Sequence, residues 1–264
     1  MLFASDLDGT LLRTDESISD RTVVAVRRAA ATRHFVYATG RPPRWVEPIA
    51  ALTGHHGIAI CSNGAVTVDM DRNNAVIDCR EIMPDAMAHG VEVIRAVLPD
   101  VGFAVDGLWG FSHTSQYQPV FAIPADYTVA PIEELLGRPA LKILLRSALT
   151  TDEALAEIEK ALGDAGSITR GSMPGIPGSD MLIELMAFGV NKGTALARVA
   201  EANGCARTNV VAFGDNRNDV EMLSWAGHGV AMANAVPVAL AVADEVTASN
   251  DHDGVAIVIE RFLD

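Results

Sequence analysis

The stretch Phe3-Ala4-Ser5-Asp6-Leu7-Asp8-Gly9-Thr10 is a short apolar run that ends in two carboxylates, one residue apart, and a Gly-Thr turn. Residues i and i+2 of an extended strand point to the same face, so a regular strand would aim Asp6 and Asp8 the same way. Two like charges this close repel each other, which gives a strand no structural benefit. A plain strand end with an Asp-Gly turn is the alternative interpretation, and this stretch alone leaves both open.

The segments that follow predict a doubly wound parallel sheet. Helices and apolar strands alternate after the opening stretch, and each strand ends in a polar turn that contains glycine. We expect a helix over 21–33, a strand over 35–38, a helix over 42–52 and a strand over 58–61. This alternation is typical of α/β folds, whose sites lie beyond the carboxyl ends of the strands. Residues 66–82 predict a hairpin at an antiparallel edge, with its turn at 71–74.

The pattern changes near Pro84, where neighbouring strands and helices predict an inserted α+β domain. Its expected helices cover 86–98 and 151–162, and its expected strands cover 103–105, 109–113, 141–145, 167–170 and 181–186, with a mobile Gly/Pro-rich loop over 171–179. The first pattern then resumes, with strands over 210–213, 229–231 and 246–247 and helices over 191–203, 220–225, 237–243 and 254–263. We therefore predict a core of residues 1–83 and 188–264 and an inserted domain of residues 84–187.

Polar residues at four turns should meet at one edge of the core sheet, because parallel strands bring their carboxyl ends together. They are Asp6 with Asp8, Thr39, Lys192, and Asp215 with Asp219. Two unit charges about 4 Å apart interact by roughly 4 kcal/mol at an effective dielectric of 20, so four carboxylates in one crevice require cations. One lysine does not balance them. A hard divalent cation with oxygen ligands does, and Mg²⁺ is the usual ion where phosphate also binds.

Carboxylates, a cation and a lysine at one edge suit phosphoryl transfer. Asp6 can attack phosphorus as a nucleophile and form an aspartyl-phosphate. Asp8 can protonate the leaving oxygen and then deprotonate the water that hydrolyses the intermediate. The Thr39 hydroxyl, the Lys192 amine and backbone N–H groups near Gly40 can hold the phosphoryl oxygens.

Composition narrows the class of protein further. The 264 residues carry a formal net charge of -14, which gives no general attraction for nucleic acid or anionic membrane. Three widely spaced cysteines favour a reducing cytoplasm over a disulfide framework or a zinc site. We find no basic N-terminal segment followed by an apolar run of signal-peptide length, and no apolar stretch long enough to span a bilayer. We expect a cytoplasmic protein, a monomer or weak homodimer, that acts on a small phosphorylated metabolite.

Four motifs together resemble those of the haloacid dehalogenase superfamily. They are Asp6-Leu7-Asp8-Gly9-Thr10, Ala38-Thr39-Gly40-Arg41, Asn191-Lys192-Gly193 and Gly214-Asp215-Asn216-Arg217-Asn218-Asp219. Their order, with a long insert between the second and third motifs, resembles the Cof-type phosphatases with a type IIB cap. The resemblance implies a Rossmann-like doubly wound parallel sheet core with an inserted α+β cap domain that selects the substrate.

The resemblance also implies roles for individual residues. Asp6 would be the nucleophile and Asp8 the general acid/base, and Thr39 and Lys192 would join them as catalytic residues. The expected substrate contacts are Thr39, Gly40, Arg41, Asn63, Lys192 and Asn218. Mg²⁺ would be bound by the Asp6 carboxylate, the Asp8 main-chain carbonyl and Asp215, with Asp219 as a supporting member of the metal site.

The sequence thus predicts a Mg²⁺-dependent phosphatase that hydrolyses a phosphorylated metabolite, with a sugar phosphate as the expected substrate, through an aspartyl-phosphate. Two alternatives stay open, namely a phosphotransferase or phosphomutase with the same site, and a non-catalytic sensor of phosphorylated metabolites. Intact Asp6, Asp8, Lys192 and Asp215 argue against the sensor. Because Asp6 and Asp8 have different roles in this chemistry, we also expect the strand to lose its regular geometry directly after Asp6.

Overall fold

The computed structural model describes residues 1–120, 123, 125–171 and 182–263. The chain divides into two compact units, one of residues 1–79 and 191–264 and one of residues 80–190. Each unit is built around its own sheet and its own apolar core. None of the described helices is both long and apolar enough to cross a membrane.

The first unit holds a sheet of eight strands in the order β14-β13-β12-β1-β2-β3-β4-β5. These strands are β1 (Leu2–Ser5), β2 (His34–Ala38), β3 (Ile58–Cys61), β4 (Val66–Asp69), β5 (Ala75–Cys79), β12 (Val210–Gly214), β13 (His228–Ala231) and β14 (Glu245–Val246). All neighbours from β14 to β3 are parallel. The β3–β4 and β4–β5 pairs are antiparallel, which confirms the hairpin at the edge of the sheet.

Strand β1 lies in the middle of this sheet because it is apolar on both faces. All four of its residues are buried, and Phe3 pairs with Phe35 on one side and with Val211 on the other. The chain runs outward from β1 through β2 and β3, and the later strands build outward from its other side through β12. The order of the strands therefore reverses beside β1, which is where doubly wound sheets hold their ligands.

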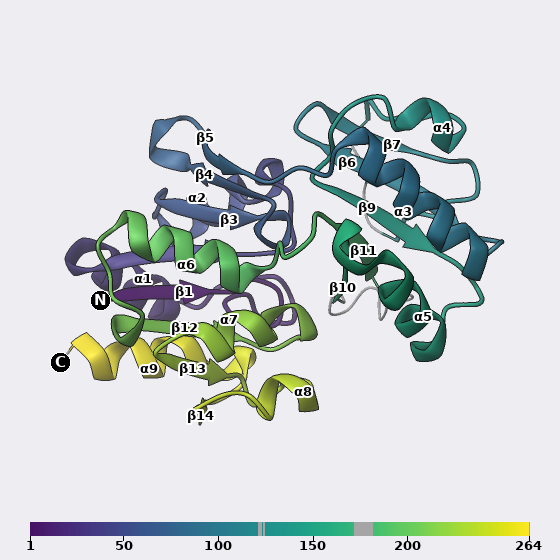
Figure 1. The fold of residues 1–264 in the computed structure, drawn as a ribbon. Helices are drawn as coiled ribbons and strands as arrows, with labels where there is room; N and C mark the ends of the chain where they lie inside the picture. Colours follow the sequence, from purple (N-terminus) through teal and green to yellow (C-terminus); the bar gives the residue numbers. More distant parts are fainter. Residues whose placement is uncertain (121–122, 124, 172–181, 264) are drawn as a thin grey trace. The chain divides into compact units, whose positions relative to one another are not determined.

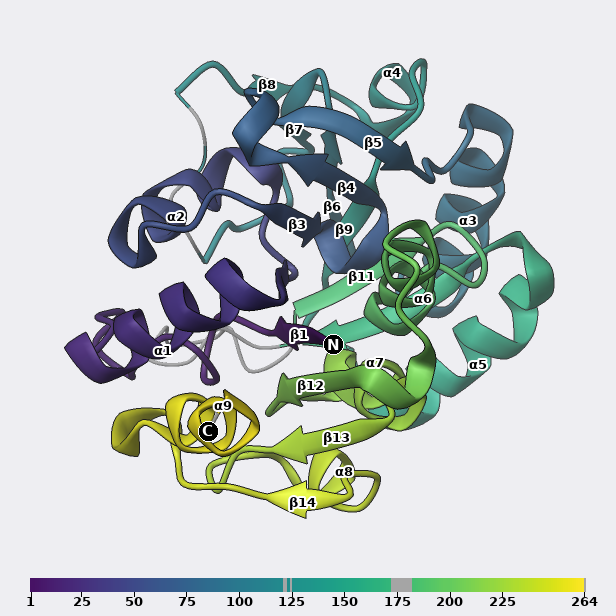
Figure 2. The same ribbon diagram turned by 90° about the vertical axis from the view of Figure 1, so that its left-hand side faces the viewer.

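Helices cover both faces of this sheet. They are α1 (Asp20–Thr32), α2 (Glu47–Thr53), α6 (Lys192–Ala202), α7 (Val220–Trp225), α8 (Pro237–Leu240) and α9 (Gly254–Leu263). Figures 1 and 2 show α1, α2 and α9 on one face and α6, α7 and α8 on the other. The α6–α8 layer packs on the alternate side chains of the strands, with Leu2, Ala4 and Ala212 among them. The predicted Rossmann-like α/β core is confirmed.

The second unit is an α+β domain with strands in the order β10-β11-β9-β6-β7-β8. These strands are β6 (Gly102–Gly107), β7 (Gly110–His113), β8 (Thr128–Val129), β9 (Lys142–Arg146), β10 (Ser167–Gly171) and β11 (Leu182–Met186). Its helices α3 (Pro84–Val97), α4 (Ile132–Leu135) and α5 (Asp152–Leu162) pack on one sheet face through residues such as Phe103 and Leu185. An ion pair between Lys142 and Glu184 is buried in this unit.

The structure differs from the sequence-based expectation in the helix over 42–52 and in the segment between β7 and β9. The helix expected over 42–52 is a 3-10 turn at Pro43–Trp45 followed by α2, with Pro48 in its first turn. The pair β8 and α4 was not expected. The expected mobile loop over 171–179 lies outside the described residues from position 172 onward.

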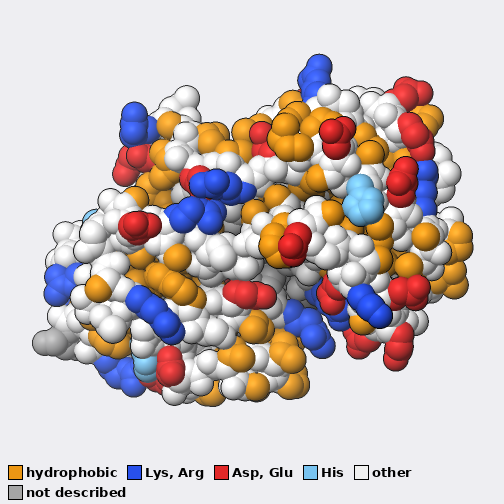
Figure 3. All heavy atoms as spheres, in the orientation of Figure 1, with side chains coloured by type: hydrophobic (Ala, Val, Ile, Leu, Met, Phe, Trp, Pro, Cys, Tyr) orange, Lys and Arg blue, Asp and Glu red, His pale blue; other side chains and the backbone are white. Residues whose placement is uncertain are grey.

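The surface carries both charged and apolar side chains. On the face shown in Figure 3, acidic and basic side chains are interspersed among apolar ones.

Candidate active site

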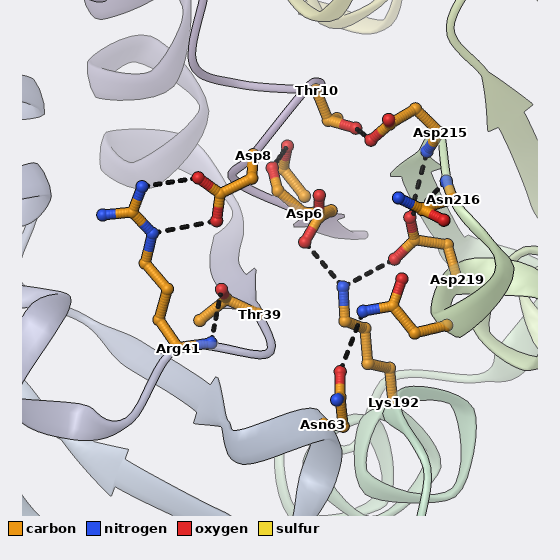
Figure 4. Close-up of polar contacts among 12 residues, drawn as sticks. Asp6, Asp8, Thr10, Thr39, Arg41, Asn63, Lys192, Asp215, Asn216 and Asp219 are labelled. Carbon is orange, nitrogen blue, oxygen red and sulfur yellow. Dashed lines mark hydrogen bonds and ion pairs between the residues drawn. The ribbon is translucent and has the colours of Figure 1, made fainter. Parts of the chain in front are cut away.

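The two carboxylates of the opening stretch point in different directions. Strand β1 ends at Ser5, and Asp6 extends its pairing by a single bond from its N–H to the Phe213 carbonyl, at 3.0 Å. The Asp6 carboxylate then faces Lys192, whereas the Asp8 carboxylate faces Arg41 (Figure 4). The strand does not stay regular as far as Asp8, so the condition under which both side chains would point the same way is not met. The strand ends one residue before Asp6, close to the expected break.

Gly9 is the residue that lets the chain turn back beside this site. Its φ of +83° is in the left-handed region, and a Cβ there would lie 2.5 Å from Asp215 Oδ2. Only glycine fits both the backbone conformation and this close approach. The turn also brings the Thr10 hydroxyl to within 2.7 Å of Asp215 Oδ1, to which it donates a hydrogen bond.

Lys192 is positioned by the start of helix α6. Asn191 caps the helix, because its side chain accepts the N–H of Thr194 and the Thr194 hydroxyl accepts the N–H of Asn191. The Lys192 side chain is completely buried, and its Nζ donates to Asp6 Oδ1 at 2.6 Å and to Asp219 Oδ1 at 2.7 Å. Burial alone would lower the pKa of Lys192. The two carboxylates outweigh burial and raise that pKa, so the lysine is held as a cation.

Asp219 organises the turn that carries the fourth motif. Its Oδ2 accepts the backbone N–H groups of Asp215, at 3.0 Å, and Asn216, at 2.9 Å. With the Lys192 contact, the buried Asp219 carboxylate receives three hydrogen bonds. Asp6, Asp215 and Asp219 each offer an oxygen within 4.8 Å of the others, so the structure brings these predicted residues together.

The electrostatics of this cluster favour an added cation. Burial, with Asp219 and Asp215 as nearby negative charges, raises the pKa of Asp6 well above its usual range, although Lys192 opposes the rise. Burial and the Asp219 charge raise the pKa of Asp215 to about 7. Both shifts mean that the carboxylates are short of positive charge. Three closely spaced carboxylate oxygens are also the ligand type that Mg²⁺ prefers, so the residues present fit this ion.

A second group of predicted residues forms the other side of the site. The turn Ser62–Gly64 has a positive φ at all three residues and binds the second motif, since the Asn63 N–H donates to the Thr39 carbonyl at 3.0 Å. The Asn63 side chain accepts from Asn218 Nδ2 at 2.9 Å. A Cβ on Gly40 would lie 3.3 Å from the Asn63 side-chain oxygen, so Gly40 and Asn63 are neighbours. This strained turn therefore fixes the amide of Asn63.

Arg41 has a partner that the sequence did not indicate. Its Nε donates to Asp8 Oδ2 at 2.8 Å and its Nη2 to Asp8 Oδ1 at 2.5 Å (Figure 4). Glu16 Oε1 lies 3.6 Å from the same Nη2. Sequence reasoning also gave no role to Thr10. The position of Thr10 at the end of the first motif indicates that it lies near the site. Nothing in the sequence relates Glu16 to Arg41.

Comparison with known proteins agrees with this geometry. Residues 3–259 match the family model described as haloacid dehalogenase-like hydrolase. The chain is 28% identical to 5-amino-6-(5-phospho-D-ribitylamino)uracil phosphatase YitU of Bacillus subtilis, over 99% of this chain and 97% of that protein.

Two solved structures share the fold. A phosphatase of the haloalkanoate (HAD) superfamily from Bacteroides thetaiotaomicron, BT1666, superposes with a TM-score of 0.82 at 25% identity, covering 99% of this chain and 94% of that one. The HAD subclass IIB sugar phosphatase BT4131 superposes with a TM-score of 0.80 at 22% identity, covering 99% and 98% of the two chains. The family model spans nearly the whole chain, and the expectation of a phosphatase is confirmed: the protein belongs to the haloacid dehalogenase-like hydrolases.

Proposed function

We propose that this protein is a Mg²⁺-dependent phosphatase that hydrolyses a small phosphorylated metabolite, of the sugar phosphate class, through an aspartyl-phosphate on Asp6. The observation that carries the proposal is the position of Lys192, whose buried amine joins Asp6 and Asp219 while Asp215 lies within reach of both carboxylates. A buried lysine between carboxylates can fix a nucleophile and a phosphoryl oxygen in one place.

Each step of the reaction uses a residue of this site. The Asp6 carboxylate attacks phosphorus, the bond from phosphorus to the leaving oxygen breaks, and Asp8 gives its proton to that oxygen. Water then attacks the phosphorus of the aspartyl-phosphate, Asp8 takes a proton from the water, and the bond to Asp6 breaks to release phosphate. Lys192 and the Thr39 hydroxyl hold the phosphoryl oxygens during both displacements.

We assign the metal to the Asp6 and Asp215 carboxylates and the Asp8 main-chain carbonyl. When bound, Mg²⁺ supplies positive charge that reduces the repulsion between the carboxylates and a phosphate dianion. Asp219 supports this site, because its oxygens already receive Lys192 and two backbone N–H groups. Thr10 holds the Asp215 carboxylate in place.

The substrate class is supported by the relatives and by the charge of the chain. YitU is named for a substrate whose phosphate is carried by a D-ribityl chain, and BT4131 is titled a sugar phosphatase. A net charge of -14 disfavours polyanionic partners such as nucleic acid. We assign the selection of the leaving group to the α+β unit, in the role of a cap domain.

The test is hydrolysis of p-nitrophenyl phosphate with Mg²⁺ and with EDTA, followed by a screen of phosphorylated sugars. We expect turnover with Mg²⁺, none with EDTA, and a loss of several orders of magnitude for Asp6→Asn. Asp71→Asn, at the exposed tip of the β4–β5 hairpin, is the matched control and should retain full activity. An inactive wild-type protein in Mg²⁺ would refute the proposal, and so would normal turnover by Asp6→Asn. Phosphorylated alcohols among the products would indicate a phosphotransferase.

A further inference from the structure

The bidentate contact between Arg41 and Asp8 has no counterpart in the reaction scheme above. Both carboxylate oxygens of Asp8 accept an N–H from the same guanidinium, at 2.8 and 2.5 Å. Both side chains are largely shielded from water, with 16% and 21% exposed. Bidentate arginine–carboxylate pairs fix direction as well as distance, because the planar guanidinium matches the plane of the carboxylate.

We propose that Arg41 is a positioning residue that sets the orientation of the Asp8 carboxyl group for proton transfer, in place of the substrate contact that the sequence predicted. This inference rests on the proposed function, in which Asp8 gives and takes the proton. Asp8 has the Arg41 guanidinium on one side, and Asp6 faces the opposite way toward Lys192 (Figure 4). Among the described residues, Arg41 is the cation that pairs with Asp8, so its removal would leave this orientation without a charged partner there.

The backbone around Arg41 is built to hold the guanidinium in place. The Arg41 N–H donates to the Thr39 hydroxyl at 3.0 Å, and the Arg41 carbonyl accepts the Ser62 N–H at 2.9 Å. Arg41 is thereby fixed to the second motif and to the strained turn that carries Asn63. A residue fixed on both sides of its peptide can position another side chain with little loss of entropy.

Glu16 explains how Asp8 can act while it stays oriented. To give a proton, one Asp8 oxygen must lose its contact with Arg41. The Arg41 Nη2 also forms an ion pair with Glu16 Oε1, at 3.6 Å, whereas Nε has only the Asp8 contact among those that the described residues record. The structure thus allows Nη2 to turn toward Glu16 while Nε keeps Asp8 Oδ2. Oδ1 is then the oxygen that passes its proton to the leaving oxygen.

Charge balance supports the same assignment. With every carboxyl group ionised, Asp6, Asp8, Asp215, Asp219 and Glu16 carry five negative charges, and Lys192 and Arg41 carry two positive ones. A divalent cation would reduce the imbalance to one negative charge, which the proton on Asp8 would remove. The positive charge of Arg41 therefore helps to balance the negative charges of Asp8 and Asp6, which lie close together.

The test compares two aryl phosphates of similar shape under saturating Mg²⁺. Phenolate leaves with difficulty unless it is protonated, whereas p-nitrophenolate leaves readily, so only phenyl phosphate depends strongly on the proton from Asp8. The value of kcat/KM covers the steps up to loss of the leaving group. We expect Arg41→Gln to lower kcat/KM by about 10-fold or more on phenyl phosphate and by much less on p-nitrophenyl phosphate. Arg41→Lys, which keeps one contact, should recover part of the loss.

A double-mutant cycle with Asp8→Asn completes the test. If Arg41 acts through Asp8, Arg41→Gln should cause no further loss on phenyl phosphate in the Asp8→Asn background. Arg21→Gln is the matched control, because Arg21 makes the same bidentate contact with Glu260, at 3.0 and 2.6 Å, and should match wild type on both substrates. Equal losses on both substrates, additive losses in the cycle or a faster Arg41→Gln enzyme would each overturn the inference. A wild-type protein inactive on both substrates would instead refute the proposed function, and the inference with it.

Discussion

The pKa of Asp215 makes the stability of the metal-free protein depend on pH in a direction opposite to that of most carboxylates. Burial and the charge of Asp219 raise this pKa from 3.8 to about 7 in the folded protein. Between about pH 4 and 7 the folded state therefore binds more protons than the unfolded state. The free energy of unfolding must fall as pH rises through this window. The difference between the two pKa values corresponds to about 4 kcal/mol.

Asp215→Asn removes the loss of stability that ionisation of Asp215 causes, and it keeps the shape of the side chain. The amide oxygen of the variant can still accept the hydrogen bond from Thr10. In EDTA at pH 8, we expect the variant to unfold at a higher temperature than wild type, by several degrees. About 4 kcal/mol sets the upper limit of the gain. In Mg²⁺ the order should reverse, because wild type gains binding energy that the variant has lost. Differential scanning calorimetry at pH 5 and pH 8, with and without Mg²⁺, measures the unfolding temperature of both proteins under each condition.

Asp251→Asn is the control for this experiment. Asp251 is exposed, and the Thr14 backbone N–H and hydroxyl lower its pKa, so its removal should bring no gain at pH 8. The reasoning fails if wild type and Asp215→Asn unfold at the same temperature in EDTA at pH 8. It also fails if metal-free wild type becomes more stable between pH 5 and pH 8.

Three further substitutions test the active site and the buried ion pair between Lys142 and Glu184. Lys192→Met should lower kcat/KM by about 10²-fold or more, because it removes the only amine at the phosphoryl position of the proposed mechanism; wild-type turnover would contradict that role. Gly9→Ala should cost about 1–3 kcal/mol in thermal or urea unfolding, since its Cβ would lie 2.5 Å from the Asp215 carboxylate at a positive φ. Lys142→Met should cost about 3–5 kcal/mol in urea unfolding by removing the buried cation that faces the Glu184 carboxylate, and addition of Glu184→Gln should recover part of that loss.

Much of the core could be predicted because each element has a local signal. The strand over 58–61 is found at the same residues in the structure, since it is a short apolar run between glycine-containing turns. Helix α9 also has the expected bounds. The helix over 42–52 was predicted less accurately, because Pro48 lacks an N–H and lies in the first turn of a separate helical segment. Strand β8 has only two residues, and its pairing with β7 is a tertiary contact with no sequence pattern of its own.

The site was predictable to the extent that the position of a residue in an element determines its surroundings. Lys192 begins a helix and Asp215 follows a strand, and these two positions sufficed to predict that they meet near Asp6. The direction of a side chain after a strand ends has no such rule. For this reason the sequence did not show that Asp8 turns to Arg41.

The separation of Asp6 from Asp8 follows from where β1 stops, and it resolves the electrostatic problem of the opening stretch. Had the strand continued, both carboxylates would share one face and compete for Lys192. Because the strand ends at Ser5, the two residues are free to face different cations: Asp6 the buried amine, and Asp8 the guanidinium. An ion pair for each carboxylate offsets part of the repulsion that a two-residue spacing imposes. Two adjacent acids with separate partners can hold different protonation states, which a nucleophile and a proton donor require.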